Sequence, residues 1–152
     1  MKHLFIVNPA AGPENAYDEI RSTLLKYNGK LDYEIYITRA RGDATRFVKE
    51  WCSTHGEKVR LYACGGDGTL NEVVNGMIGF KQASLTSYPC GSGNDFVKYY
   101  GGKQKFLNID ELILASEESI DLMKVSDRYC INVCHFGSST KCSVKSPSGK
   151  KY

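Results

Sequence analysis

The sequence predicts an α/β protein in which a parallel sheet carries helices on both faces and a short β-hairpin follows. Up to about residue 115, strand-like runs alternate with runs whose apolar residues recur at helical spacing. Each strand-like run ends in a loop rich in glycine or polar residues. Repeated strand–loop–helix units of this kind build parallel sheets covered by helices.

The composition is that of an ordinary globular protein. The 152 residues are 41% hydrophobic and 24% charged, with a formal net charge of +3, and the length suits a domain with a buried core. The basic residues form no stripe with aromatic residues, which argues against a nucleic-acid partner. The apolar run at 4–7 is too short for a signal peptide or a transmembrane segment, so a cytoplasmic location is expected.

The first half of the chain predicts three strands and two helices. Strands are expected at 3–7, 33–37 and 59–63, where apolar, aromatic and β-branched residues are concentrated. The first helix ends near Gly29 and has four residues on its apolar face: Tyr17, Ile20, Leu24 and Leu25. The second helix has Asp43 as its predicted N-cap and ends before Gly56, and its apolar face holds Ala44, Phe47, Val48 and Trp51.

A helix at 70–77, a strand at 84–88 and a helix at 109–114 continue the alternation. Loops with glycine or polar residues begin after the four strands, at residues 8, 38, 65 and 91. Because the carboxyl ends of parallel strands lie at one edge of a sheet, these loops are expected together at that edge, where α/β proteins bind ligands.

The loop Gly65-Gly-Asp-Gly-Thr69 is the strongest functional signal in the chain. Glycines let the backbone approach a ligand, and the helix that follows offers unpaired N–H groups and the positive end of its dipole. Asp67 would repel a phosphate unless its carboxylate meets a metal ion or a substrate hydroxyl. The pattern predicts a nucleotide or phosphate site rather than an ordinary structural turn.

The pattern changes near Ser119. Runs at 120–125 and 129–136 flank a polar turn and predict a hairpin, which should open a second domain because two strands alone are marginally stable. Residues 137–152 are almost free of apolar side chains and are expected to be disordered. We therefore expect an α/β domain at 1–116, the start of a truncated β domain at 117–136, and a tail that is native, frameshifted or an artificial end.

The six cysteines form no Cys-x-x-Cys pair and have no histidine at zinc-finger spacing. All six thiols are expected to be reduced, and no metal-ligating residue is assigned.

Three motifs together resemble the diacylglycerol kinase-like lipid kinases, a family that also includes sphingosine kinases. They are Asn8-Pro-Ala-Ala-Gly12, Gly65-Gly-Asp-Gly-Thr-Leu-Asn-Glu72 and Pro89-Cys-Gly-Ser-Gly-Asn-Asp-Phe96, in the order in which the family has them. The resemblance implies an N-terminal domain of the NAD kinase/diacylglycerol kinase type. It also implies a C-terminal β-sandwich, with ATP bound in the cleft between the two domains.

By this resemblance, the nucleotide would contact residues in four loops. They are Asn8, Pro9, Ala10, Ala11, Gly12, Thr38, Gly66, Asp67, Gly68, Thr69, Leu70, Asn71, Glu72 and Ser92. Asp67 would lie near the γ-phosphate, Mg²⁺ or the acceptor hydroxyl and is the only catalytic candidate, while Asn71 and Glu72 could instead only cap and orient their helix. The family's catalytic carboxylate and Mg²⁺-binding loop belong to the C-terminal domain, and nothing after Phe136 matches them.

The resemblance thus implies the ATP-binding part of a kinase that transfers the γ-phosphoryl group of ATP to a diacylglycerol-like lipid hydroxyl. Its partners would be ATP, Mg²⁺ and a lipid at a membrane surface, and the protein would be peripheral to the membrane. The chain alone is expected to be inactive. An NAD kinase-like phosphotransferase and a non-catalytic nucleotide-binding fragment are the alternatives, and the acceptor lipid and oligomeric state stay open.

Overall fold

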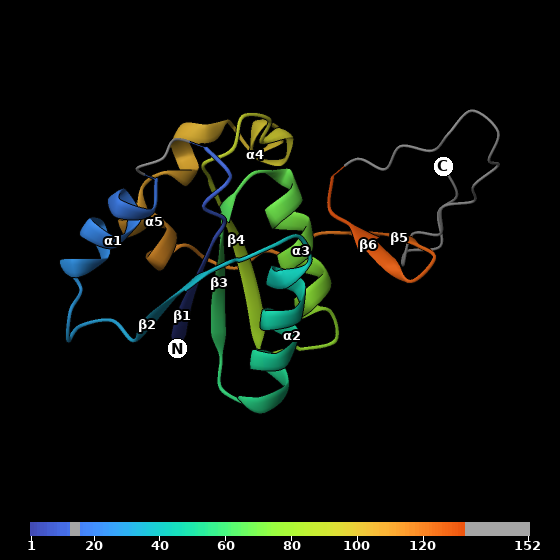
Figure 1. Cartoon of the computed structure of the whole chain (residues 1–152), viewed down its shortest axis with the longest axis horizontal. Helices are drawn as coiled ribbons and strands as arrows, with labels where there is room; N and C mark the ends of the chain where they lie inside the picture. Colours follow the sequence, from blue (N-terminus) through green and yellow to red (C-terminus); the bar gives the residue numbers. More distant parts are fainter. Residues whose placement is uncertain (13–15, 133–152) are drawn as a thin grey trace.

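The computed structural model describes residues 1–12 and 16–132, and within them a four-stranded parallel sheet forms the centre of the molecule (Figure 1). The strands are β1 (Lys2–Val7), β2 (Tyr33–Ile37), β3 (Val59–Gly65) and β4 (Ala83–Pro89), in the order β2-β1-β3-β4. Every neighbouring pair is parallel, so the four carboxyl ends lie at one edge. The predicted α/β class is confirmed.

Helices cover both faces of this sheet because the central strands are apolar on both sides. On one face, Leu4 and Ile6 of β1 pack with α2 (Asp43–Thr54) and α3 (Asp67–Met77). On the other face, Phe5 and Val7 pack with α1 (Ala16–Leu25) and α5 (Ile109–Leu114). Alternate residues of one strand therefore supply two separate halves of the core.

The start of α2 differs from the prediction. Gly42, with φ of 85°, is the N-cap residue, and Asp43 is the first residue of the helix. The prediction of Asp43 as N-cap is wrong because its carboxylate bonds elsewhere: it accepts hydrogen bonds from the Tyr36 hydroxyl at 2.9 Å and the Arg39 N–H at 3.0 Å. The side chain thereby joins β2 to α2.

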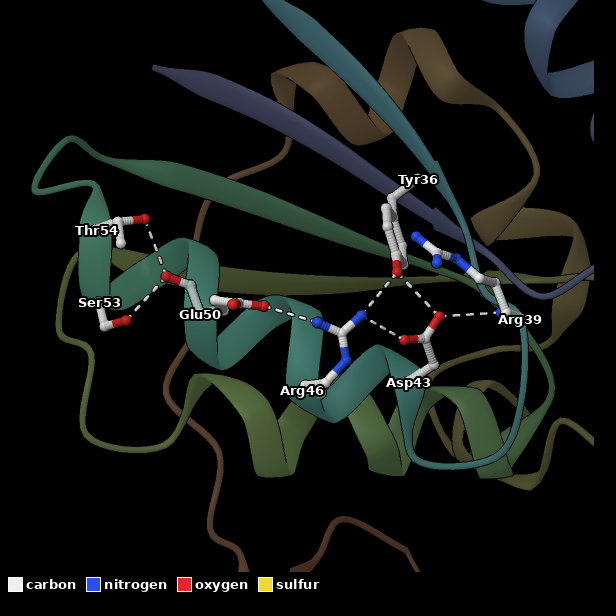
Figure 2. A network of polar contacts seen from close by, with 7 residues as sticks. All are labelled: Tyr36, Arg39, Asp43, Arg46, Glu50, Ser53 and Thr54. Carbon is white, nitrogen blue, oxygen red and sulfur yellow. Dashed lines mark hydrogen bonds and ion pairs between the residues drawn. The ribbon is translucent and has the colours of Figure 1, made fainter.

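Arg46 completes this network on the outer face of α2, where Figure 2 shows its guanidinium between two carboxylates. It contacts Asp43 Oδ1 and Glu50 Oε2, each at 2.7 Å, and donates to the Tyr36 hydroxyl oxygen at 3.2 Å. The hydrogen bond from Arg46 is the main reason that the pKa of the Asp43 carboxyl lies below its ordinary value. These bonds hold the loop after β2 close to the helix that follows it.

Two short elements follow β4: α4 (Asp95–Tyr99) and a 3₁₀ helix, η1 (Lys103–Phe106). Next, α5 ends on the buried guanidinium of Arg60, which donates to the carbonyl oxygens of Leu112, Ile113 and Ala115 at 2.7–2.9 Å. These carbonyls would otherwise be unpaired at the helix end. Arg60 on β3 therefore fixes the point at which the chain leaves the α/β layers.

The predicted hairpin is present but shorter, with antiparallel strands β5 (Met123–Val125) and β6 (Arg128–Cys130) beside α3 (Figure 1). The side chain of Asn75 on α3 pairs with the Tyr129 backbone: its Nδ2 donates to the carbonyl at 2.8 Å and its Oδ1 accepts from the N–H at 2.9 Å. Ile131 also packs against the α2–α3 half of the core.

The second strand was expected to continue to residue 136, but residues 133–136 lie outside the described residues, as does the predicted tail at 137–152. The division into domains at 116 and 136 stays a prediction. No helix among the described residues is long and apolar enough to cross a membrane.

Candidate functional site

Three loops at the carboxyl edge of the sheet surround a cavity of about 610 Å³. They follow β1, β3 and β4, and we call them the first, second and third loops. The cavity therefore lies where the chain order reverses between β1 and β3, as in other open α/β sheets. Its lining residues are Asn8, Ala10, Ala11, Gly12, Gly66, Asp67, Gly68, Thr69, Cys90, Gly91, Ser92 and Gly93. Three of the four loops predicted to meet at this edge therefore line a hollow of ligand size, and the loop after β2 is not among them.

Asn8 joins the first loop to the second. Its backbone N–H continues the pairing of β1 with β3 by donating to the Cys64 carbonyl at 2.9 Å. Its side-chain Oδ1 accepts from the Ala10 N–H at 3.0 Å, and its Nδ2 donates to the Thr69 hydroxyl at 3.0 Å. One amide thus shapes the first loop and holds the start of α3.

The loops pack so closely that two positions admit only glycine. A Cβ on Gly12, whose φ is 94°, would lie 2.2 Å from the Cys90 carbonyl oxygen. A Cβ on Gly91 would lie 2.6 Å from the Gly66 Cα, so these two backbones touch directly. The first loop is therefore packed against the third, and the third against the second.

Asp67, the first residue of α3, has protein partners for its negative charge. Its Oδ2 accepts from the Asp95 N–H at 3.0 Å and its Oδ1 from the Phe96 N–H at 3.2 Å. Both donors belong to the first turn of α4, where N–H groups lack helical partners. The carboxylate among the glycines thus caps a neighbouring helix, a role that the sequence analysis did not consider.

A second cavity, of about 270 Å³, adjoins the same carboxylate. It lies between the start of α3 and the chain after β6, and its lining residues are Asp67, Gly68, Asn71, Asp95, Cys130, Ile131 and Asn132. The Oδ1 atom of Asn71 is buried there and has no hydrogen-bond partner among the described residues. Asp67 and Gly68 line both cavities and therefore lie between them.

Most of the residues predicted to contact a nucleotide line one of the two cavities. The first is lined by Asn8, Ala10, Ala11, Gly12, Gly66, Asp67, Gly68, Thr69 and Ser92, and the second by Asn71. Pro9 is exposed in the first loop but is not among the lining residues.

The other three predicted residues have their side chains engaged elsewhere. The Thr38 hydroxyl is buried and donates to the Val7 carbonyl at 3.3 Å. Leu70 belongs to the core between the sheet and α2–α3. Glu72 accepts from the Gly42 N–H at 2.9 Å, which attaches the loop after β2 to α3. These three positions support the loops rather than line the cavities.

Other lining residues were missing from the predicted set. Gly91 and Gly93 belong to a glycine pattern directly after a strand, and this signal could have identified them. Cys90 lines the cavity directly after the end of β4, and burial raises the pKa of its thiol. Residues 130–132 reach the second cavity only because the hairpin packs on α3, and no local pattern indicates this.

Two predictions about sulfur and metal concern the same region. Four of the six cysteines are described, and no disulfide joins any two of these four: Cys52, Cys64, Cys90 and Cys130. The other two, at 134 and 142, lie outside the described residues. Within residues 1–12 and 16–132, no three His, Cys, Asp or Glu side chains gather as ligands for a metal ion.

Comparison with known proteins adds independent evidence. The model of the diacylglycerol kinase catalytic domain matches residues 2–125. Diacylglycerol kinases of Staphylococcus aureus strains RF122 / ET3-1 and MRSA252 are each 35% identical over 150 residues, which are 96% of this chain and 47% of the relative. A crystal structure of a diacylglycerol kinase from Bacillus anthracis str. Sterne aligns with a TM-score of 0.68 and 26% identity, over 84% of this chain and 45% of that one.

The chain therefore spans about half the length of the relatives that it matches. The matches confirm the resemblance drawn from the three motifs.

Proposed function

Because the chain belongs to the diacylglycerol kinase catalytic domain family, we propose that it is the ATP-binding part of a lipid kinase. The reaction is transfer of the γ-phosphoryl group of ATP to the hydroxyl of a diacylglycerol-like lipid. The protein acts from the cytoplasm at the surface of the membrane that contains the lipid.

The observation that carries this proposal is the larger cavity, built from three loops at the carboxyl edge of the sheet. The phosphates of ATP bind against the turn at 66–69, where α3 begins with N–H groups that have no helical partner. The first and third loops close the cavity on either side. Its volume of about 610 Å³ is in the usual range for small-molecule sites.

Asp67 is the residue that we propose acts on the acceptor. It lies between the two cavities, so a lipid hydroxyl in the smaller cavity meets a phosphate in the larger one beside this carboxylate. The two N–H groups of α4 hold the carboxylate in place and leave further lone pairs for the incoming hydroxyl. Because phosphoryl transfer depends mainly on positioning and electrostatics, such a fixed carboxylate is well suited to orient the attacking oxygen.

The donor set also fits Mg²⁺ accompanying ATP. This ion typically binds through one or two carboxylates together with substrate phosphates, and the Asp67 carboxylate lines the larger cavity, where the phosphates would bind. When bound, the ion neutralises charge on the phosphates.

The experiment that tests the proposal compares two glycines of positive φ. A Cβ at Gly12 would meet the Cys90 carbonyl, whereas a Cβ at Gly29, with φ of 74°, would meet nothing within 4 Å. We expect Gly12→Ala to abolish calorimetric ATP binding and Gly29→Ala to leave it intact. Asp67→Ala and Gly68→Ala should both impair ATP binding or turnover. Normal ATP binding in Gly12→Ala, with the variant folded, would contradict the proposed site.

Activity is measured separately from binding, with labelled ATP and three acceptors: diacylglycerol, sphingosine and NAD. Phosphorylated diacylglycerol supports the proposal, and phosphorylated NAD would replace it with the NAD kinase alternative. ATP binding without product is the result that we expect for this chain by itself, and a non-catalytic nucleotide-binding role gives the same result. Loss of turnover in an intact relative that carries the Asp67→Ala equivalent tests whether this carboxylate takes part in the family's reaction.

A further inference from the structure

Beside the site, α4 and η1 present a group of aromatic and basic side chains to solvent. Tyr99 is 86% exposed and Tyr100 is 37% exposed, while the lysines of the same segment are exposed as well. We call Lys98, Tyr99, Tyr100, Lys103 and Lys105 the Tyr–Lys patch. Tyr99 is the most exposed of the large hydrophobic side chains that the structure describes.

Two of the three patch lysines have no carboxylate partner among the described residues. Between Asp95 and Asp110 the sequence has three lysines and no carboxylate. Lys98 forms an ion pair with Asp95 at 2.7 Å. No ion pair joins Lys103 or Lys105 to a carboxylate of the described residues. Two cationic side chains thus follow two exposed tyrosine rings along one short stretch of chain.

The backbone under the patch is anchored, so the exposed rings project from a fixed base. Val97 is buried beneath α4, and the Gly102 N–H donates to its carbonyl at 2.8 Å. The Tyr100 ring contacts Phe96 on one side and Tyr99 on the other, with centroid distances of 4.9 and 5.2 Å. The three aromatic rings therefore pack against one another at α4.

The patch also lies at the same end of the molecule as the two cavities. Figure 1 shows α4 at the upper end, next to the loops at the carboxyl edge of the sheet. The link is direct, because the Asp67 carboxylate that lines both cavities bonds the first turn of α4. Anything that holds the patch therefore lies close to the smaller cavity.

We propose that the Tyr–Lys patch docks this chain on an anionic phospholipid surface. Tyrosine favours the boundary between headgroups and acyl chains, because its ring is apolar and its hydroxyl is polar. Lysine is attracted to the negative surface of an anionic bilayer and keeps its charge in water while its stem lies along apolar surface. The proposal rests on the proposed function, since a lipid acceptor must be reached at a bilayer.

The test is sedimentation of the 152-residue chain with vesicles, made either of phosphatidylcholine alone or of phosphatidylcholine mixed with phosphatidylglycerol. We expect binding only to the anionic vesicles, and weaker binding at high salt. The double variant Lys103→Gln/Lys105→Gln should bind about 25-fold more weakly, at roughly fivefold for each lysine. Tyr99→Ser should weaken binding several-fold as well.

Two control variants match these changes elsewhere on the surface. Lys26→Gln/Lys49→Gln removes the same charge from exposed positions, and Leu114→Ser removes another apolar side chain, which is 85% exposed. Both should bind anionic vesicles like the unaltered chain. Calorimetric ATP binding is measured for every variant and should not change, because the patch residues do not line the larger cavity.

The possible results separate this proposal from the proposed function. Absence of vesicle binding by the unaltered chain overturns the docking proposal, even if ATP binds normally. The docking proposal is also overturned if the control variants lose as much vesicle binding as the patch variants, or if the patch variants bind vesicles fully. The patch would then be a candidate contact surface for a protein partner. Vesicle binding without any ATP binding would instead contradict the nucleotide site while upholding the docking surface.

Discussion

Acidification should destabilise the protein through one histidine in the core. His3 on β1 is 4% exposed, and its Nδ1 lies 2.7 Å from the hydroxyl oxygen of Tyr62 on β3. Burial, together with the nearby positive charge of Arg60, lowers the pKa of His3 from 6.5 to about 4. The folded protein therefore keeps this imidazole neutral at a pH where an exposed histidine becomes charged.

The direction of the change in stability follows from which state of the chain, folded or unfolded, binds the proton. Above pH 6.5 the histidine is neutral in both folded and unfolded chains, and its contribution to stability is fully present. Between pH 6.5 and about 4 the unfolded chain binds a proton that the folded chain does not, so the free energy of unfolding falls as the pH is lowered. At about 1.4 kcal/mol for each pKa unit, the full loss from this group is about 3 kcal/mol.

Urea unfolding at several pH values between neutral and pH 4 measures this effect. His3→Gln keeps a polar side chain near the Tyr62 hydroxyl but cannot titrate, so its stability should fall less steeply than that of the unaltered chain. Other groups, such as Asp43, titrate equally in both proteins and cancel in the comparison. Parallel curves for His3→Gln and the unaltered chain would refute the reasoning.

Three further predictions concern the rest of the structure. Arg60→Met should lower the free energy of unfolding by about 3 kcal/mol, because three helix-end carbonyls lose a charged donor, whereas exposed Arg21→Met should change it little; urea unfolding decides. Asn75→Leu should speed hydrogen exchange of the Tyr129 amide far more than that of core amides in β1, and equal exchange would show that the hairpin docks by other contacts. Thiol titration of the denatured chain without reductant should find six free thiols, and fewer than six would reveal a disulfide. In the folded chain, Cys64 should react last, because it is buried and burial raises the pKa of its thiol.

Much of the fold was predictable because each central strand has apolar residues on both faces, which only a sheet covered by helices on both sides can bury. The bounds of β2 and α5 match the predicted ones for this reason. The start of α2 did not follow the local rule, since Asp43 is used by partners on β2 and in its loop. Likewise α4 depends on a cap from Asp67, 28 residues away, which no short sequence window contains.

The candidate site was predictable to the extent that strands end in distinctive loops. Residues of the first and second loops could be predicted as site residues because they directly follow strands. Their position in the sequence does not show which way each side chain points. Thr38 and Leu70 turn into the protein, so their neighbours rather than their own chemistry decide what they do. The smaller cavity depends on the packing of the hairpin against α3, which is a long-range contact.

The direct contact between Gly66 and Gly91 has a consequence for how a ligand is received. Backbones that touch cannot rearrange one at a time, so the second and third loops must keep or lose their shape together. A ligand that enters such a pre-organised cradle loses little conformational entropy to loop ordering, and more of its contact energy appears as affinity. The free and ligand-bound forms of these loops should therefore superimpose closely, with adaptation left to side chains at the rim.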